Sequence, residues 1–303
     1  MSFELTILGS GAALPTAKRK PTAQYLCCND RHLLIDCGEG TQNELRKNKI
    51  HFQKITHILI SHLHGDHYFG LVGLLSTLHL LGRNQGITIY GPEELEQIIR
   101  LQLEVGGSKL GFELTFVPLN GKEHKLLFED KLIEIWTFPL NHRIPTNGFR
   151  IQEKQKDRSI DGERFKAAGL SLTCIPLFKR GEDVVLEDGT IVSFRDFSFD
   201  PPKPKSYSFC SDTKYDERII PFIQDSTVLY HEATFLDALK ERAKATHHST
   251  ALEAGKIAHK SKAGKLLIGH LSARYEDLVE HLIEVKSQFE NAVVVADGDR
   301  FTF

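Results

Sequence analysis

Residues 61–67 read SHLHGDH, so three histidines and one aspartate fall within a single short stretch. His62 and His64 are two residues apart, so in an extended chain both imidazoles project to the same side and can bind one metal ion. The glycine that follows lets the backbone turn, which brings Asp66 and His67 round to a second ion nearby. The spacing predicts two metal ions at one loop; the alternative is a polar loop in which histidines occur by chance.

This motif lies between two apolar segments of different character. ITHILI (55–60) is typical of a buried strand, and YFGLVGLLSTLHLLG (68–82) has the length and apolar density of a helix. We therefore expect the motif on a strand-to-helix loop. Other strand-like runs end at, or directly precede, residues that can take part in chemistry, namely His142, Asp212, His231 and His270. We therefore expect these residues to lie together along one edge of the fold.

The remaining pattern is that of an α/β protein. An opening β-meander is predicted by FELTILGS (3–10), YLCCND (25–30) and HLLIDCG (32–38), and a further strand by ITIYGP (87–92). Helices are expected at 93–105, 249–261 and 275–288. Residues 151–205 differ, because they show weak hydrophobic periodicity, mixed charges and a proline-rich end; we interpret them as an inserted arm.

Composition limits the class of protein. The chain has 303 residues, 41 % of them hydrophobic, which is ample for a large core. It lacks a signal-peptide pattern and any apolar run of roughly 18 to 20 residues, so we expect no membrane contact. Five scattered cysteines without CxxC spacing favour reduced thiols in the cytoplasm. A net charge of −2 argues against a globally basic nucleic-acid binder but leaves a local basic surface open.

Imidazole nitrogens combined with carboxylate oxygens and no cysteine favour zinc, with manganese and iron as alternatives by ligand type. The pattern HxHxDH resembles the signature of the metallo-β-lactamase superfamily. Further residues of this resemblance follow in order in LIDCGEGTQ, PLNHRIPTNGFR, FCSDT and IGHLSARY. The resemblance implies an α/β fold, a four-layer αββα sandwich, for the single domain 1–303, with the flexible arm 151–205 inserted in it.

The same resemblance implies the ligand sets. One zinc ion would be held by His62, His64 and His142, and the other by Asp66, His67 and His270. Asp212 would bridge the two ions, and Asp36 would orient a ligand histidine through its other ring nitrogen.

Within that superfamily the chain is similar to the ribonuclease Z family over nearly its whole length. The similarity rests on HEAT (231–234), HHST (247–250), HLSARY (270–275) and the position of the arm. It implies a homodimeric, zinc-dependent endoribonuclease with two zinc ions per subunit, which removes 3′ trailers from precursor tRNA and leaves a tRNA 3′-hydroxyl and a trailer 5′-phosphate. Two departures affect recognition: Lys20 stands where the family has asparagine, and Cys174-Ile175-Pro176 replaces the expected Gly-Pro tip of the arm.

The resemblance also implies catalytic roles. Asp66 would orient or deprotonate the attacking water, and His248, held by Glu232, would protonate the departing ribose oxygen. The alternative for Glu232 and His248 is an ordinary buried ion pair. The predicted RNA contacts are Lys18, Arg19, Lys20, Lys179 and Arg180.

Three alternatives stay open. The cationic loop at 18–20 and the arm can each be solvated surface rather than RNA contacts. The enzyme can be a phosphodiesterase of the same fold that acts on small or cyclic phosphodiesters. The chain can also be a non-catalytic RNA-binding module whose metals are structural. Structural metal sites leave no open coordination position, whereas a catalytic site keeps one for water or substrate.

Overall fold

The computed structural model describes residues 3–303, which divide into two compact units. The larger unit runs to Gln152 and resumes at Lys205, and the smaller unit is Glu153–Pro204. The smaller unit falls within the segment 151–205 that the sequence set apart.

The first sheet of the larger unit has seven strands within residues 3–303, in the order β18-β1-β2-β3-β4-β5-β6. Strands β1 to β3 form the predicted antiparallel meander, and β3 to β6 run parallel. The bounds are β1 (Phe3–Gly9), β2 (Ala23–Cys28), β3 (Arg31–Ile35), β4 (Ile55–Leu59), β5 (Ile87–Pro92), β6 (Leu114–Leu119) and β18 (Arg300–Thr302).

The second sheet is also seven-stranded over the described residues, in the order β17-β16-β15-β14-β9-β8-β7. Strands β14 to β17 are parallel, whereas β9 pairs antiparallel with β14. The bounds are β7 (Lys125–Glu129), β8 (Ile133–Leu140), β9 (Thr146–Glu153), β14 (Ser206–Cys210), β15 (Val228–Glu232), β16 (Lys265–Gly269) and β17 (Ala292–Val294).

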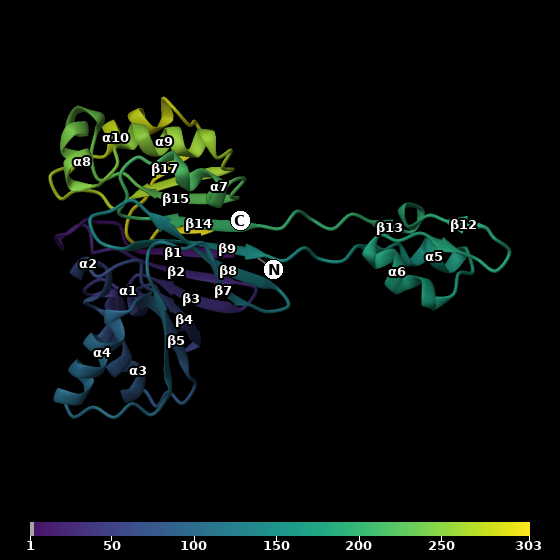
Figure 1. Cartoon of the computed structure of the whole chain (residues 1–303), viewed down its shortest axis with the longest axis horizontal. Helices are drawn as coiled ribbons and strands as arrows, with labels where there is room; N and C mark the ends of the chain where they lie inside the picture. The colour runs from purple at the N-terminus through teal and green to yellow at the C-terminus, as the bar shows by residue number, and fades with distance from the viewer. Residues whose placement is uncertain (1–2) are drawn as a thin grey trace. The chain divides into compact units, whose positions relative to one another are not determined.

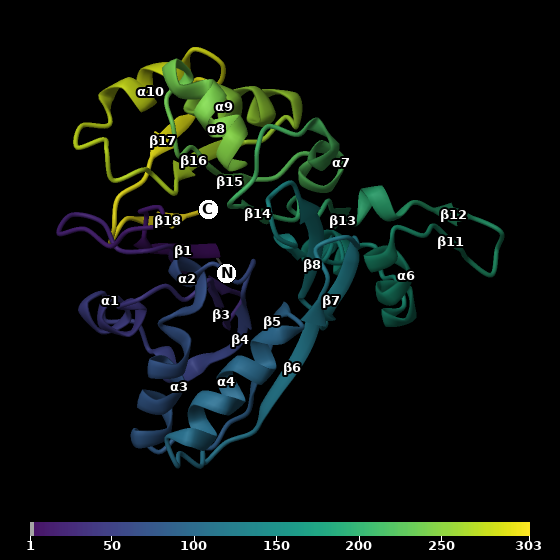
Figure 2. The ribbon, with the colours of Figure 1, turned by 60° about the vertical axis from the view of Figure 1, so that its left-hand side comes forward.

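The two sheets pack face to face, and helices cover their outer faces, as Figures 1 and 2 show. A continuous core lies between the sheets and includes Phe149, Tyr207, Phe209 and Tyr230. A second apolar cluster joins the first sheet to α1 (Thr41–Lys47), α3 (Leu71–Leu80) and α4 (Glu94–Val105). A third joins the second sheet to α7 (Ile220–Ile223), α9 (Ala251–Lys260) and α10 (Val279–Lys286). This arrangement confirms the predicted αββα sandwich.

The predicted helix at 68–82 is divided. A short helix, α2 (Gly65–Tyr68), contains part of the motif, and α3 starts only at Leu71. Between them Gly70 approaches the turn after β3 so closely that a Cβ there would lie 2.2 Å from the carbonyl oxygen of Gly38. The amide of Cys37 also donates to the carbonyl of His67 at 2.7 Å. The motif loop is therefore fixed against the end of β3.

The smaller unit has a core of its own. Two short strand pairs, β10 (Ser159–Ile160) with β13 (Ser198–Phe199) and β11 (Val184–Val185) with β12 (Ile191–Val192), accompany α5 (Gly162–Ala167) and α6 (Ile175–Arg180). Its buried centre contains Phe165, Cys174 and Phe178. Cys174, which we expected near the tip of the arm, thus packs in this core.

Two further findings concern the described chain. No helix within residues 3–303 has the length and apolar character needed to cross a bilayer. All five cysteines have free thiols, so none is joined in a disulfide.

Candidate metal centre and active-site cleft

The predicted ligands converge at the ends of parallel strands. The motif follows β4, while Asp36, Asp212 and His270 follow β3, β14 and β16. These last three residues have positive φ angles of 55°, 51° and 54°, a conformation that non-glycine residues adopt at a cost of about 1–3 kcal/mol each. Such strain concentrates at functional sites, because the surrounding structure must hold it in place.

The first set of ligand-type atoms surrounds one point. His62 Nε2 lies 2.9 Å from His64 Nδ1, and His142 Nε2 lies 3.2 Å from the same nitrogen. Asp212 Oδ2 lies 3.4 Å from His62 Nε2 and 3.7 Å from His142 Nε2. These four atoms lie within 4.8 Å of one another, as ligands of one ion do. The donor set, three imidazoles and a carboxylate, fits zinc.

The second set lies on the other side of Asp212. His67 Nε2 and His270 Nε2 lie 3.2 and 3.1 Å from Asp212 Oδ1. Each nitrogen is also 3.5 Å from Asp66 Oδ2. Both nitrogens are buried, and neither has a hydrogen-bond partner among the described residues. Orphaned buried nitrogens beside carboxylate oxygens are explained by a bound cation, so these residues fit a metal.

Asp212 therefore turns one carboxylate oxygen toward each set. Its Oδ2 faces His62 and His142, and its Oδ1 faces His67 and His270. A bridging carboxylate has this geometry.

Each ligand imidazole that turns Nε2 to the centre is held through its other nitrogen. Asp36 Oδ2 lies 2.7 Å from His67 Nδ1, and Thr234 Oγ1 lies 3.0 Å from His270 Nδ1. The carbonyl of His247 accepts from His142 Nδ1 at 3.0 Å. Such partners fix ring orientation and tautomer, which metal binding requires.

Ser61 connects the motif to Asp36 and Asn147 through hydrogen bonds. Its amide donates to Asp36 Oδ1 at 2.8 Å, and its hydroxyl lies 3.0 Å from both Asp36 Oδ2 and His62 Nδ1. Its carbonyl accepts from the backbone and side-chain nitrogens of Asn147. Sequence analysis did not select Ser61 or Thr234, because serine and threonine are common and their bonds here span distant segments.

The charges of the cluster are shifted in the direction that metal binding needs. Burial lowers the pKa of His62 to about 3 and that of His142 to about 4, so both rings are neutral at pH 7, the form that can bind a metal ion. Burial opposes ionisation of Asp66 and Asp212, but attraction to the neighbouring histidines is stronger and holds the pKa of both carboxyls well below the ordinary range. His67 differs, because three surrounding carboxylates overcome burial and raise its pKa. A cation must displace that proton.

Glu232 and His248 lie beside the centre. Glu232 is fully buried and accepts hydrogen bonds from the Thr213 amide and from the amide and hydroxyl of Thr234. Its Oε1 lies 2.8 Å from His248 Nδ1. Burial alone would lower the pKa of His248, but attraction to Glu232 raises it to about 9. His248 also lies close enough to Asp212 and His270 to share their cluster.

A cavity of about 700 Å³ opens onto the centre. His64, Asp66, Asp212, His248 and His270 line it, so residues from both predicted ligand sets and two of the predicted catalytic residues meet one solvent-accessible space. Three exposed arginines from separate parts of the chain also line it: Arg143, Arg242 and Arg274. Sequence analysis did not select them, because they come from distant segments and no shared motif joins them. A phosphate chain would meet cations on several sides of this cleft.

The cationic loop after β1 is only partly exposed. Lys18 is exposed and pairs with Glu276 at 3.3 Å. Arg19 is 8 % exposed and donates to the carbonyls of Ser272 and Tyr275 in the loop that follows His270. Lys20 is half-buried. The loop also touches the centre, because the amide of Ala13 donates to Asp66 Oδ2 at 2.8 Å.

The other residues predicted from the sequence are His231, Lys179 and Arg180. His231 is fully buried within β15, not after it, and its Nδ1 lies 2.7 Å from the Glu232 carbonyl. Lys179 and Arg180 are exposed at the end of α6 in the smaller unit, where Arg180 pairs with Glu182 at 2.8 Å.

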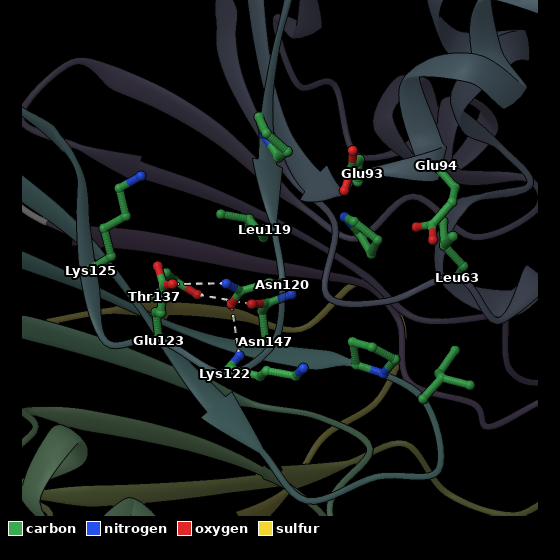
Figure 3. Close-up of a pocket in the computed structure, with 14 residues that line it drawn as sticks. Leu63, Glu93, Glu94, Leu119, Asn120, Lys122, Glu123, Lys125, Thr137 and Asn147 are labelled. Atoms are coloured by element: carbon green, nitrogen blue, oxygen red, sulfur yellow. Dashed lines mark hydrogen bonds between the residues drawn. The ribbon is translucent and has the colours of Figure 1, made fainter.

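A second cavity, of about 590 Å³, lies where the chain passes from β6 to β7 (Figure 3). Leu63 of the motif lines it, but none of the predicted ligands does. Asn147 also lines this cavity: its Oδ1 accepts from the Gly121 amide at 3.2 Å, and its Nδ2 donates to the Ser61 carbonyl. A residue that lines this cavity therefore also binds the first residue of the motif loop, Ser61.

A sandwich of this topology, with a His/Asp cluster at its strand ends, defines a hydrolase of the metallo-β-lactamase fold. The chain is 40 % identical to "Ribonuclease Z" of Parabacteroides distasonis over 300 residues, 99 % of each chain. It is 42 % identical to "Ribonuclease Z" of Cytophaga hutchinsonii over 302 residues, 99 % of this chain and 96 % of that one. The chain belongs to the ribonuclease Z family, and is therefore a nuclease.

Other comparisons agree on the fold. Human tRNase Z, short form (ELAC1), superposes with a TM-score of 0.72 at 28 % identity and 98 % coverage of both chains. The metallo-β-lactamase fold protein YhfI of Bacillus subtilis superposes with a TM-score of 0.71 at 20 % identity and full coverage of both. Residues 3–159 also match the family model described as "Anti-Pycsar protein Apyc1", and that part of the chain belongs to this family as well.

Proposed function

We propose that the protein is the endoribonuclease that removes 3′ trailers from precursor tRNA, leaving a 3′-hydroxyl on the tRNA and a 5′-phosphate on the trailer. The main observation in support is the position of the Asp212 carboxylate. One of its oxygens faces each of two ligand sets, and Asp212 lines an open cleft. A closed structural site would leave no such access. The substrate is inferred from the relatives, which are a ribonuclease Z and a tRNase Z.

We propose two zinc ions per chain. His62, His64 and His142 would hold one, Asp66, His67 and His270 the other, and Asp212 both. Two ions held by these residues would supply charge that neutralises the phosphate and lowers the pKa of a bound water towards neutrality. Metal analysis of the purified protein should give two equivalents, and one or none would contradict this stoichiometry.

The chain's own residues handle the protons. Asp66 is held by the Ala13 amide and borders the cleft, so its carboxylate is positioned to orient the attacking water and accept its proton. His248 is positioned to donate a proton to the departing ribose 3′ oxygen, because Glu232 keeps its ring oriented and charged.

The proposed RNA contacts are cationic side chains that are exposed or, in the case of Lys20, half-buried. Arg143, Arg242 and Arg274 would bind phosphates next to the cut, and Lys18 and Lys20 phosphates along the rim. Lys179 and Arg180 would contact the tRNA body through the smaller unit. Arg19 was predicted as an RNA contact as well, but its burial and its two carbonyl partners favour a bracing role.

Homodimerisation is also proposed. Leu80 and Leu81 at the end of α3, and Leu101 and Val105 on α4, are exposed apolar side chains on neighbouring helices. A second copy that covers them would remove this apolar surface from water. Sedimentation equilibrium should give twice the chain mass, and a monomer at assay concentration would contradict the proposal. A cytoplasmic location stays a prediction from the thiol argument.

Removal of the smaller unit tests the substrate assignment. Gln152 pairs directly with Ser206 across β9 and β14, so a short Gly-Ser turn can replace residues 153–205 without moving either strand. We expect the shortened protein to hydrolyse bis(p-nitrophenyl) phosphate at the full-length rate but to lose cleavage of precursor tRNA. Undiminished cleavage would contradict the RNA role of this unit. A full-length protein that turns over only small or cyclic phosphodiesters would contradict the proposed function.

A further inference from the structure

Phe69 is an exposed aromatic residue at the metal centre. It follows α2 directly, and 62 % of its surface is exposed although it lines the same cavity as His64 and Asp66. An exposed phenyl ring forgoes the favourable free energy of burial. Large apolar groups left exposed within a polar rim mark interaction sites.

The ring is held in place from beneath. A Cβ atom at position 65 would lie 2.2 Å from Cε2 and 2.3 Å from Cζ of Phe69, so the ring lies against the bare backbone of Gly65. Tyr68 contacts it edge to face, with ring centroids 5.0 Å apart. Gly65 separates the ligands His64 and Asp66, so the ring rests on the ligand loop itself, and its remaining surface is open to the cleft.

The charges around the ring indicate what it binds. Arg143, Arg242 and Arg274 line the same cavity, which suits a polyanionic chain better than an apolar small molecule or a protein side chain. Aromatic rings among such cations are the usual stacking surfaces for unpaired bases, since every base has a π face. A base that stacks on Phe69 would set the position of its phosphate relative to the loop that carries Asp66.

We propose that Phe69 is a stacking platform for the base of a nucleotide that flanks the scissile phosphate. This inference rests on the proposed function and adds a positioning contact to it. The contact is largely independent of base identity, so it would fix the register of cleavage without imposing a sequence requirement.

The test combines variants of Phe69 with abasic substrates. Two precursor tRNAs carry a single abasic nucleotide, one immediately 5′ and one immediately 3′ of the cut. With the unaltered protein, one of them should lose about 5- to 150-fold in kcat/KM, the range expected for one base–aromatic stack. In Phe69→Leu, which still covers Gly65 but lacks a π face, the same abasic change should cost less than about twofold. Phe69→Trp should keep the full penalty.

Leu14→Ala is the matched control. Leu14 is 65 % exposed and lines the same cavity, but it is aliphatic, so its removal should leave the abasic penalty at the unaltered value. Equal penalties in Phe69→Leu and the unaltered protein at both positions would overturn the proposal. So would a change of subunit number in Phe69→Leu, which would assign the ring to a protein interface. Failure of the unaltered protein to cut unmodified precursor tRNA would instead overturn the proposed function.

Discussion

His248 Nδ1 lies 2.8 Å from the fully buried Oε1 of Glu232, and this carboxylate is saturated with three further hydrogen bonds from Thr213 and Thr234. A carboxylate so held cannot turn away from the ring. The imidazole is thereby kept charged and oriented beside the metal ligands, which is the arrangement that proton donation to a leaving group requires.

His248→Ala should lower kcat for precursor tRNA by about 10²- to 10⁴-fold, because the departing 3′ oxygen then leaves without a positioned proton. Zinc content should stay unchanged. A substrate whose 3′ bridging oxygen is replaced by sulfur has a leaving group that needs no proton, so the variant should cleave it at nearly the unaltered rate. Equal loss on both substrates would assign His248 to another role.

The same ion pair predicts a pH dependence of stability in the metal-free protein. The pKa of His248 rises from 6.5 to about 9 on folding, so the protonated ring favours the folded state. This stabilisation, about 1–3 kcal/mol, is fully present below about pH 6.5 and is lost as the pH rises through about 9. Urea unfolding of chelated protein from pH 6 to 10 measures it. His248→Gln should remove this part of the slope, and an unchanged slope would contradict the assignment.

Arg19→Ala should destabilise the protein by about 1–3 kcal/mol, because the partly buried carbonyls of Ser272 and Tyr275 lose the donor that the buried Arg19 supplies. The loop after His270 should loosen, so zinc affinity should fall together with stability. Lys18→Ala is the control: Lys18 is exposed, and its loss should change stability by less than about 0.5 kcal/mol. If Arg19→Ala raises only KM for RNA, with stability and zinc affinity intact, Arg19 is an RNA contact after all.

Asp36→Asn should weaken zinc binding by about 10- to 100-fold, because the ring of His67 loses the carboxylate that orients it. Competition with a chromophoric chelator measures the change. Asp30→Asn provides a comparison, since Asp30 makes a similar 3.1 Å contact with His32 but lies on the surface away from the ligands. Equal effects of the two substitutions would contradict the orienting role of Asp36.

Local patterns predicted much of this protein. Alternating and continuous apolar runs predicted the strands. The two-residue spacing of His62 and His64 predicted that their imidazoles lie on the same side of the chain. The division of the helix at 68–82 was missed, since the approach of Gly70 to Gly38 joins segments that are distant in sequence. The burial of Arg19 and of Cys174 depends likewise on long-range packing, so a cationic loop and an arm tip looked exposed in the sequence.

The active-site cleft was the least predictable part. Arg143, Arg242 and Arg274 come from three unrelated segments, and only the folded sheets bring them to one cavity. Phe69 belongs to an apolar run that is otherwise typical of a buried helix, so its exposure could not be read from hydrophobicity. The predicted ligand residues could be named from the sequence because the HxHxDH motif is rare and the family resemblance implies the others.

The most direct measurement is the position of the cut in an end-labelled precursor tRNA, mapped at nucleotide resolution with and without chelator. The proposed function predicts a single cut just after the discriminator nucleotide, a 3′-hydroxyl on the tRNA product, and no cleavage once metal is removed. Cleavage that survives chelation, or cuts scattered through the trailer, would contradict it.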